Sequence, residues 1–250
     1  MKKIIIFDLD NTLAPSKSII SNEMANNLID LTNQYDIAII SGASFNQFKK
    51  QIIPFLYGNL HKIYLFPTCG ASFYKYEKDW QNVYLEELSE NDKEKIYNAF
   101  NECFKHVNFN EKHKYGEILE DRKTQITFSA LGQNAPIDLK EEWDPDLKKR
   151  QKMVDFLKTK ISEFSIRIGG STSIDVTYKN IDKAYAINKI KQYLNYDIKD
   201  CLFIGDSFSE NGNDYPIKKI GMDYVEVINP DETLQIIKNL KTSLFAKITT

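Results

Sequence analysis

The chain has 250 residues, of which 42% are hydrophobic and 27% are charged, a composition typical of a globular protein with one or two domains. Its formal net charge of -2 provides no basic excess to neutralise a nucleic-acid backbone, so a small-molecule substrate is favoured over a nucleic-acid partner. No run reaches the roughly 18 apolar residues of a membrane span, and the apolar run at the N-terminus stops at Asp8, too early for a signal peptide.

The cysteines indicate neither a disulfide framework nor a zinc site. Cys69, Cys103 and Cys201 lie far apart without a CxxC spacing, and the three histidines add no metal-ligand pattern. Reduced thiols of this kind are typical of cytoplasmic proteins, and we expect that location.

The first part of the chain alternates between predicted strands and helices. Residues 3–7 are a continuous apolar run, as expected for a strand buried on both faces. The elements that follow are a helix capped by Ser21 and ending near 34, a strand at 37–40, a helix at 45–53 and a strand at 62–66. This alternation predicts right-handed crossovers and a parallel sheet.

The pattern changes after residue 70 and returns near 183. The changed part has an antiparallel pair at 71–76 and 82–85, a helix at 90–106, a strand at 125–130, a helix at 146–163 and a hairpin at 164–168 and 173–177. Helices at 183–194, 213–219 and 231–240 then alternate with strands at 201–204 and 223–227. We therefore predict an α/β fold: a Rossmann-like parallel-sheet core at 1–83 and 184–250, with an inserted α+β domain at 84–183.

Two acidic groups follow predicted strands of the core. Asp8 and Asp10 follow the first strand, and a period of two places both carboxylates on one side. Open parallel sheets bind ligands beyond the carboxyl ends of their strands. A bound cation would offset the mutual repulsion of these acids; the alternative is that they simply begin a turn.

The second acidic group follows the strand at 201–204. Its oxygen-bearing side chains, which suit Mg²⁺, are Asp206, Asn211, Asn213 and Asp214. Alternatively, this is a polar loop in which Asn213 or Asp214 caps the next helix. Taken together, the two groups predict a magnesium site.

A lysine and a serine could act on a phosphoryl group at the same edge. Lys183 follows Asp182, a plausible N-cap, and a lysine in a first helical turn opposes the helix dipole unless a phosphate or an aspartate lies nearby. The alternative is a solvated surface lysine. Ser41 begins a turn before a helix, where a hydroxyl and backbone N–H groups can hold a phosphate oxygen, although Ser44 could simply cap that helix.

In this order, these residues resemble the four motifs of the haloacid dehalogenase superfamily. The motifs are Asp8-x-Asp10-x-Thr12, Ser41, Lys183 and Gly205-Asp206 followed by Asn213-Asp214. The position of the insert is similar to that of the type IIB cap subclass. Within that subclass, segments 65–70, 127–134, 149–153 and 168–176 resemble the eukaryotic-type phosphomannomutase family.

The resemblance implies the chemistry of the core. Asp8 would attack a phosphoryl group and become an aspartyl phosphate, while Asp10 would act as general acid–base on the sugar oxygen. Lys183 and Ser41 would stabilise the phosphoryl oxygens. The implied ligands of the cofactor, Mg²⁺, are Asp8, the Asp10 carbonyl, Asp206 and, in support, Asp214.

The resemblance also implies substrate-binding positions in the insert, namely Arg122, Gln133, Arg150, Ser173 and Asp175. Ser173, Asp175 and Thr177 alternate with apolar residues, which independently predicts one polar strand face. Within a regular strand Arg122 would lie on the same face as the apolar residues Ile126 and Phe128, so it fits the substrate-binding role only if it precedes that strand. Arg150 lies in a charge-rich helix, where a solvated arginine is the usual case.

Two residues depart from the family pattern. Asn11 replaces the usual glycine, a mild change because asparagine tolerates a left-handed backbone. Gln133 stands where the mutases carry another phosphate-binding arginine, and glutamine can hydrogen-bond but adds no charge.

The function that we expect is phosphoryl transfer on a hexose phosphate, of the phosphomannomutase type. The alternative is a sugar-phosphate phosphatase that uses the same nucleophile. A non-catalytic binding protein on this fold would be marked by the loss of Asp8 or Asp10, and both are present. A homodimer through the insert is implied by the family alone.

Overall fold

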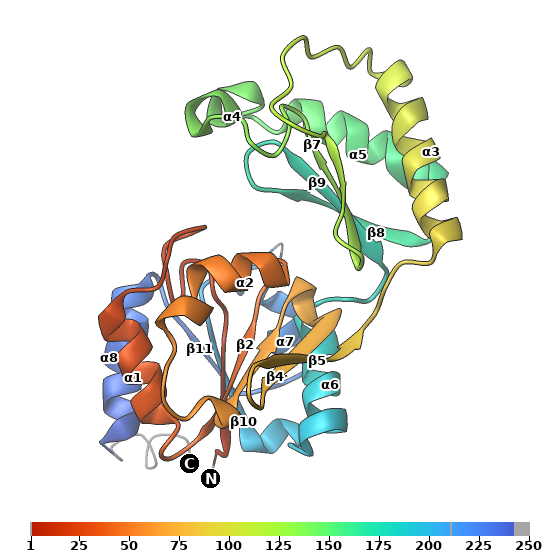
Figure 1. The fold of residues 1–250 in the computed structure, drawn as a ribbon. Coiled ribbons are helices and arrows are strands. Elements are labelled where there is room, and N and C mark those ends of the chain that lie inside the picture. The colour runs from red at the N-terminus through yellow and green to blue at the C-terminus, as the bar shows by residue number, and fades with distance from the viewer. Residues whose placement is uncertain (1, 211, 243–250) are drawn as a thin grey trace. The chain divides into compact units, whose positions relative to one another are not determined.

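The computed structural model describes residues 2–210 and 212–242. The chain divides into two compact units (Figure 1). The first, which we call the core unit, comprises residues 1–85 and 181–250; the second, the insert, comprises residues 86–180.

The core unit is built on a seven-stranded sheet with the order β11-β10-β1-β2-β3-β4-β5. The pairings from β11 through β3 are parallel, and β4 and β5 extend the sheet as an antiparallel pair. The strands are β1 (Ile4–Phe7), β2 (Asp36–Ile40), β3 (Ile63–Phe66), β4 (Ser72–Tyr76), β5 (Trp80–Leu85), β10 (Cys201–Gly205) and β11 (Tyr224–Glu226). The predicted α/β class and parallel sheet are confirmed.

Helices cover both faces of the core sheet, which is why its strands read as continuous apolar runs. Alternate residues of β1 lie in different hydrophobic clusters: Ile5 packs with residues of α1 (Asn22–Leu31) and α8 (Pro230–Lys241), and Ile6 with residues of α6 (Lys183–Leu194) and α7 (Tyr215–Lys219). The remaining helices of this unit are α2 (Phe45–Gln51) and the 3-10 segments η1 (Ile53–Phe55), η2 (Leu60–Lys62), η3 (Thr68–Gly70) and η4 (Ile198–Asp200).

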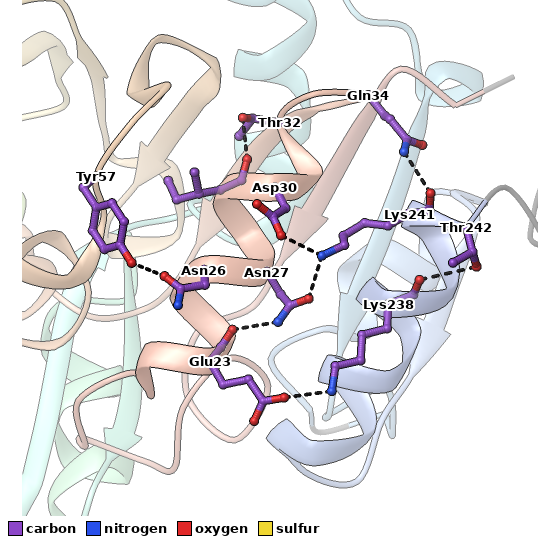
Figure 2. Close-up of polar contacts among 11 residues, drawn as sticks. Glu23, Asn26, Asn27, Asp30, Thr32, Gln34, Tyr57, Lys238, Lys241 and Thr242 are labelled. Atoms are coloured by element: carbon purple, nitrogen blue, oxygen red, sulfur yellow. Dashed lines mark hydrogen bonds and ion pairs between the residues drawn. The ribbon is translucent and has the colours of Figure 1, made fainter.

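Side-chain contacts fix α1 against α8 at the surface of the core unit (Figure 2). Ser21 caps α1 as expected, accepting from the Met24 N–H at 3.1 Å. The Lys238 ammonium pairs with Glu23 at 2.8 Å, and the Lys241 ammonium pairs with Asp30 at 2.8 Å. These contacts hold the last described helix to the first.

The insert is a four-stranded antiparallel sheet with helices on one face. Its strand order is β6-β7-β9-β8, and the apolar face, which includes Phe128 and Ile174, packs against α3 and α5. The elements are α3 (Glu90–His106), β6 (Leu119–Asp121), β7 (Gln125–Ser129), α4 (Ile137–Trp143), α5 (Lys148–Lys160), β8 (Phe164–Gly169) and β9 (Ser173–Tyr178). The sequence did not predict β6 or α4, because both are short, β6 is mostly half-buried and α4 is mostly exposed.

No helix within residues 2–210 and 212–242 is long and apolar enough to cross a membrane.

Candidate active site

The sheet itself positions Asp8. Its backbone N–H donates to the Ile204 carbonyl at 2.9 Å, which continues the β1–β10 ladder one residue beyond β1. The Asp8 side chain is 2% exposed. Its Oδ2 atom has no hydrogen-bond partner within the described part of the chain, so this buried oxygen is available to a ligand.

Lys183, the first residue of α6, is buried against two carboxylates. Asp182 caps the helix by accepting from the Tyr185 N–H at 3.0 Å. The Lys183 side chain is 0% exposed, and its Nζ atom donates to Asp8 Oδ1 at 2.5 Å and to Asp214 Oδ1. Those two charges offset the unfavourable position of a cation at a helix N-terminus. The alternative of a solvated surface lysine is therefore wrong.

The loop after β10 brings in two further carboxylates. Asp214 Oδ2 accepts from the backbone N–H groups of Asp206 and Ser207 at 3.1 and 3.0 Å. A Cβ atom added to Gly205 would lie 2.5 Å from that oxygen, so the close approach of Asp214 to the backbone requires glycine here. Asp214 occupies the N-cap position of α7 but makes no side-chain capping bond. Its carboxylate therefore binds Lys183 and the loop after β10 instead of capping the helix.

Three carboxylates and one ammonium form a cluster in which Asp206 alone is half-buried and the other three groups are buried. One oxygen from each of Asp8, Asp206 and Asp214 lies within 4.8 Å of the others. Burial raises the pKa of Asp8 to about 7 against the attraction of Lys183, and burial together with Asp214 raises the pKa of Asp206. Burial lowers the pKa of Lys183, but Asp8 and Asp214 outweigh it and leave that pKa raised. This surplus of negative charge and the unpartnered Asp8 Oδ2 fit a divalent cation with oxygen ligands.

Asp10 lies near this cluster in sequence but is not part of it. Its Oδ1 atom accepts from the Lys17 N–H at 2.7 Å. Asn11 has a φ of 60°, which confirms the left-handed backbone expected there. The Asp10 side chain is therefore held by its own loop, and metal binding by its carbonyl stays a prediction.

Ser41 directly follows β2 and begins a tightly bonded loop. Its Oγ atom accepts from the Ala43 N–H at 3.0 Å, and its carbonyl accepts from the Cys69 N–H at 2.8 Å. Ser44 occupies the N-cap position of α2 but makes no side-chain capping bond. The Ser41 hydroxyl is thus fixed by local backbone, as a group that contacts a phosphoryl oxygen would need to be.

The face of the insert sheet that lies opposite α3 and α5 is polar, as predicted. Ser173 and Asp175 on β9 lie opposite Ser129 and Thr127 on β7. The Thr127 hydroxyl donates to Asp175 Oδ1 at 2.8 Å, and the Gln125 amide donates to the same oxygen at 2.6 Å. Hydroxyl and amide groups thus orient the single carboxylate of β9.

Arg122 precedes β7. It therefore lies outside the regular strand, as the sequence analysis required for a residue that contacts the substrate. Its guanidinium donates to Glu120 at 2.8 Å and to Gln133 Oε1 at 3.3 Å. The Gln133 amide donates in turn to Ser129 Oγ at 3.0 Å. Gln133 therefore links a cation to the hydroxyl face of the sheet.

Arg150 lies in an environment different from the one expected. It is 1% exposed, so it is not a solvated helix residue. Its Nε donates to Asp144 at 2.8 Å, and its NH1 donates to the carbonyls of Gly169 and Gly170 at 3.1 and 2.7 Å. Direct phosphate binding would require these bonds to break, so we do not retain Arg150 as a phosphate ligand.

Comparison with known proteins identifies the family. A model of the eukaryotic phosphomannomutase family matches residues 24–243. The chain belongs to this family. A phosphomannomutase of Encephalitozoon cuniculi (strain GB-M1) is 30% identical over 250 residues, which cover 93% of this chain and 91% of that protein. Phosphomannomutase 1 of Homo sapiens is 26% identical over 253 residues, covering 93% and 89%.

Solved structures show the same fold at lower identity. A haloacid dehalogenase-like hydrolase from Bacteroides thetaiotaomicron superposes with a TM-score of 0.69 at 16% identity, covering 96% of this chain and 100% of that one. The Plasmodium falciparum IMP-nucleotidase superposes with a TM-score of 0.71 at 20% identity, covering 98% and 62%. This phosphomannomutase family member is therefore an enzyme with phosphomannomutase-like phosphoryl transfer as its function, and it has the fold of a haloacid dehalogenase-like hydrolase.

The structure brings together most of the core residues that the sequence analysis named. In the insert it shows a polar contact at Gln133 from a residue that the sequence analysis did not name. Asn211 lies outside the described residues, and the Asn213 amide oxygen accepts from Lys183 at 3.3 Å. In the insert, the Lys140 ammonium donates to the Gln133 carbonyl at 2.9 Å. No sequence pattern marked Lys140, because it lies on α4, which was not predicted.

Proposed function

We propose that this enzyme is a Mg²⁺-dependent mutase of hexose phosphates in which Asp8 forms an aspartyl phosphate. The observation that carries the proposal is the environment of Asp8. The carboxylate is buried, Lys183 holds Oδ1, and Oδ2 has no partner among the described residues. A fixed carboxylate with one engaged and one available oxygen suits in-line attack on phosphorus.

Each transfer uses two carboxyl groups. An Asp8 oxygen forms a bond to phosphorus while the bond from phosphorus to the sugar oxygen breaks. Asp10, held by the Lys17 N–H, gives its proton to the leaving sugar oxygen. In the return step, Asp10 takes the proton from another sugar hydroxyl, which attacks the phosphorus and frees Asp8.

The surrounding charges stabilise the transferred group. Asp8, Asp206 and the Asp10 carbonyl would hold Mg²⁺, with Asp214 in support. The bound ion would neutralise charge that develops on the phosphoryl oxygens. Lys183 and Ser41 would donate to the same oxygens, and their positions are already fixed by α6 and by the loop after β2.

The insert would bind the parts of the substrate that do not react. Arg122 supplies a partly exposed guanidinium for the second phosphate. Gln133 would add a hydrogen bond at that phosphate, and Ser173 and Asp175 would contact sugar hydroxyls. A mutase must accept the sugar in two orientations, and a face of hydroxyls and amides tolerates both.

Gln133 also supports the second candidate, a sugar-phosphate phosphatase. A neutral amide holds a phosphate more weakly than a guanidinium, because charge-assisted bonds are roughly twice as strong. A loosely held intermediate leaves before transfer is complete, and water then attacks the aspartyl phosphate. We therefore expect isomerisation accompanied by appreciable hydrolysis.

Phosphorus NMR on one reaction mixture distinguishes the two candidates. Mannose 1-phosphate or glucose 1-phosphate is supplied with Mg²⁺ and increasing hexose 1,6-bisphosphate. The expected result is activator-dependent formation of the 6-phosphate, with inorganic phosphate as a second product. Inorganic phosphate alone at every activator concentration would reject the mutase and leave the phosphatase.

Arg122→Ala tests the second phosphate site. Isomerisation should fall by roughly 10²-fold, as for loss of a charged hydrogen bond of about 3 kcal/mol, while hydrolysis of a small aryl phosphate stays unchanged. The matched control is Lys158→Ala, an exposed change on α5. Equal losses of both activities in Arg122→Ala would show that this arginine supports the fold only.

We also propose a homodimer formed through the insert and a cytoplasmic location. The dimer follows from the family alone, and sedimentation of the purified protein tests it. The location is supported by the three cysteines, which are all buried thiols.

A further inference from the structure

We propose that Arg150 and Asp144 form a positioning device that sets Asp175, the sugar-hydroxyl ligand of the insert, through the β8–β9 turn. This inference rests on the proposed function, because it concerns how the sugar phosphate is held. Arg150 touches neither reacting atoms nor substrate in this scheme. It acts through Gly169 and Gly170.

The first step is the pair itself. The Arg150 side chain is 1% exposed and that of Asp144 is 0% exposed. Asp144 Oδ2 accepts from Arg150 Nε at 2.8 Å and from the Arg150 backbone N–H at 3.1 Å, and its carbonyl accepts from NH2 at 3.2 Å. The guanidinium is therefore locked to the start of α5 in one orientation.

The second step leads from the guanidinium to the turn. Arg150 NH1 donates to the carbonyls of Gly169 and Gly170 at 3.1 and 2.7 Å. Neither glycine has a side chain to fix its own position, and Gly170 has a left-handed φ of 48°. A planar guanidinium whose other nitrogens are already engaged thus determines where the two carbonyls lie.

The third step leads from the turn to Asp175. Gly169 pairs with Ser173 on β9, two residues before Asp175. A Cβ atom added to Gly169 would lie 2.8 Å from Asp175 Oδ2, so the backbone of the turn approaches that oxygen closely. Thr127 and Gln125 hold the other oxygen, Oδ1. A small movement of the turn therefore alters the space in which the carboxylate sits.

Two variants and one control test this path. Arg150→Lys keeps a positive charge for Asp144 but cannot also donate to both carbonyls. Gly169→Ala leaves the ion pair intact and crowds Asp175 Oδ2 directly. Each should raise KM for the hexose phosphate by about tenfold or more, the scale expected when a binding group shifts by a fraction of an ångström. In each, kcat for a small aryl phosphate should stay within about twofold, because that substrate needs only the core unit. Lys158→Ala is the matched control on α5.

A double-mutant cycle separates positioning from mere support of the fold. In an Asp175→Ala background, Arg150→Lys should cause no further rise in KM, because its effect passes through Asp175. An equal rise with and without Asp175 would overturn the proposal. So would a loss of aryl phosphate hydrolysis in Gly169→Ala that matches its loss of sugar-phosphate turnover.

A ligand-free measurement keeps this test independent of the proposed function. The carboxyl carbon-13 resonance of Asp175 is recorded in the unliganded full chain and in Arg150→Lys. A changed chemical shift and a changed titration midpoint are expected, whereas an unchanged resonance would overturn the positioning role. If the unmodified enzyme hydrolyses aryl phosphate but turns over no hexose phosphate, the proposed function fails, while the resonance still decides the role of Arg150.

Discussion

The core unit and the polar sheet face of the insert hold their polar groups in different ways. In the core unit, Lys183 and the carboxylates of Asp8 and Asp214 are almost fully buried and are bonded to one another. On the insert face, Arg122 and Glu120 stay partly exposed, and most other contacts join hydroxyls and amides. The core therefore concentrates charge where a transition state can use it, whereas the insert offers weaker bonds that can suit more than one sugar orientation.

This difference separates the expected effects of substitutions. A buried charge that loses its partner is costly for stability as well as for chemistry, whereas a half-exposed hydrogen bond mainly changes affinity. Changes in the core should therefore affect every substrate. Changes on the insert face should affect sugar phosphates and spare small aryl phosphates.

The largest effect is expected from Asp8→Asn. The amide cannot form the acyl phosphate, so kcat should fall by at least about 10³-fold for hexose and aryl phosphates alike. The fold should persist, because Lys183 keeps Asp214 as a partner. Steady-state kinetics with both substrates and a thermal melt check this. Appreciable turnover by the variant would remove Asp8 as the nucleophile.

Chelation should have a comparable effect on the core. Excess chelator should abolish turnover of both substrates, and added Mg²⁺ should restore it. Mg²⁺ alone should also raise the melting temperature, because an ion that binds only the folded state stabilises it. Asp206→Asn should reduce this rise. Full activity in excess chelator would contradict the magnesium requirement.

Lys183→Ala should lower kcat by roughly 10²-fold, because the ammonium stabilises transferring charge. Without Mg²⁺ it should also lower the free energy of unfolding by about 3–5 kcal/mol, the cost of leaving buried charges unpaired. Lys191→Ala is the matched control on α6, since that lysine is 65% exposed and pairs only at the surface with Asp197. Similar kinetics for the two variants would place Lys183 outside the chemistry.

Gln133→Arg tests how firmly the insert holds the second phosphate. A guanidinium near Arg122 would hold the second phosphate more firmly, and the ratio of isomerisation to hydrolysis should rise by roughly tenfold, which corresponds to about 1.4 kcal/mol. Gln133→Met, which removes the hydrogen bonds and adds no charge, should lower the ratio. The phosphorus NMR assay measures both products. A ratio that is unchanged in both variants would show that Gln133 does not contact the phosphate.

The smallest effect is expected at the surface of the core unit, in the contacts of Figure 2. Lys241 donates to Asn27 at 2.9 Å and to Asp30 at 2.8 Å. Because these contacts are partly exposed to solvent, Lys241→Ala should lower the free energy of unfolding by less than about 1 kcal/mol and leave kcat unchanged. Urea unfolding measures this. A loss as large as that of Lys183→Ala would show that burial does not explain the difference between the two lysines.

Much of the fold was predictable from local patterns. The apolar runs placed β1, β2 and β10 within a residue or two of their ends, and Ser21 and Asp182 marked helix starts that the structure shows. The hairpin at β8 and β9 followed from alternation around a pair of glycines. β6 and α4 were not predicted, because their few half-exposed residues carry no clear period.

Local patterns were enough to identify which acids end the core strands and which face of β9 is polar, because both depend on periods of two or on runs of a few residues. The partners of the long cations, in contrast, became known only from the packing of the whole chain. Lys183 reaches Asp214, 31 residues away, and Arg150 reaches Gly170, 20 residues away. For Lys183 the helix dipole predicted a nearby aspartate or phosphate but not which one, and for Arg150 the charge-rich helix predicted solvent. Their burial depends on partners that only the packed chain brings within reach, since a buried charge is stable only when it is paired.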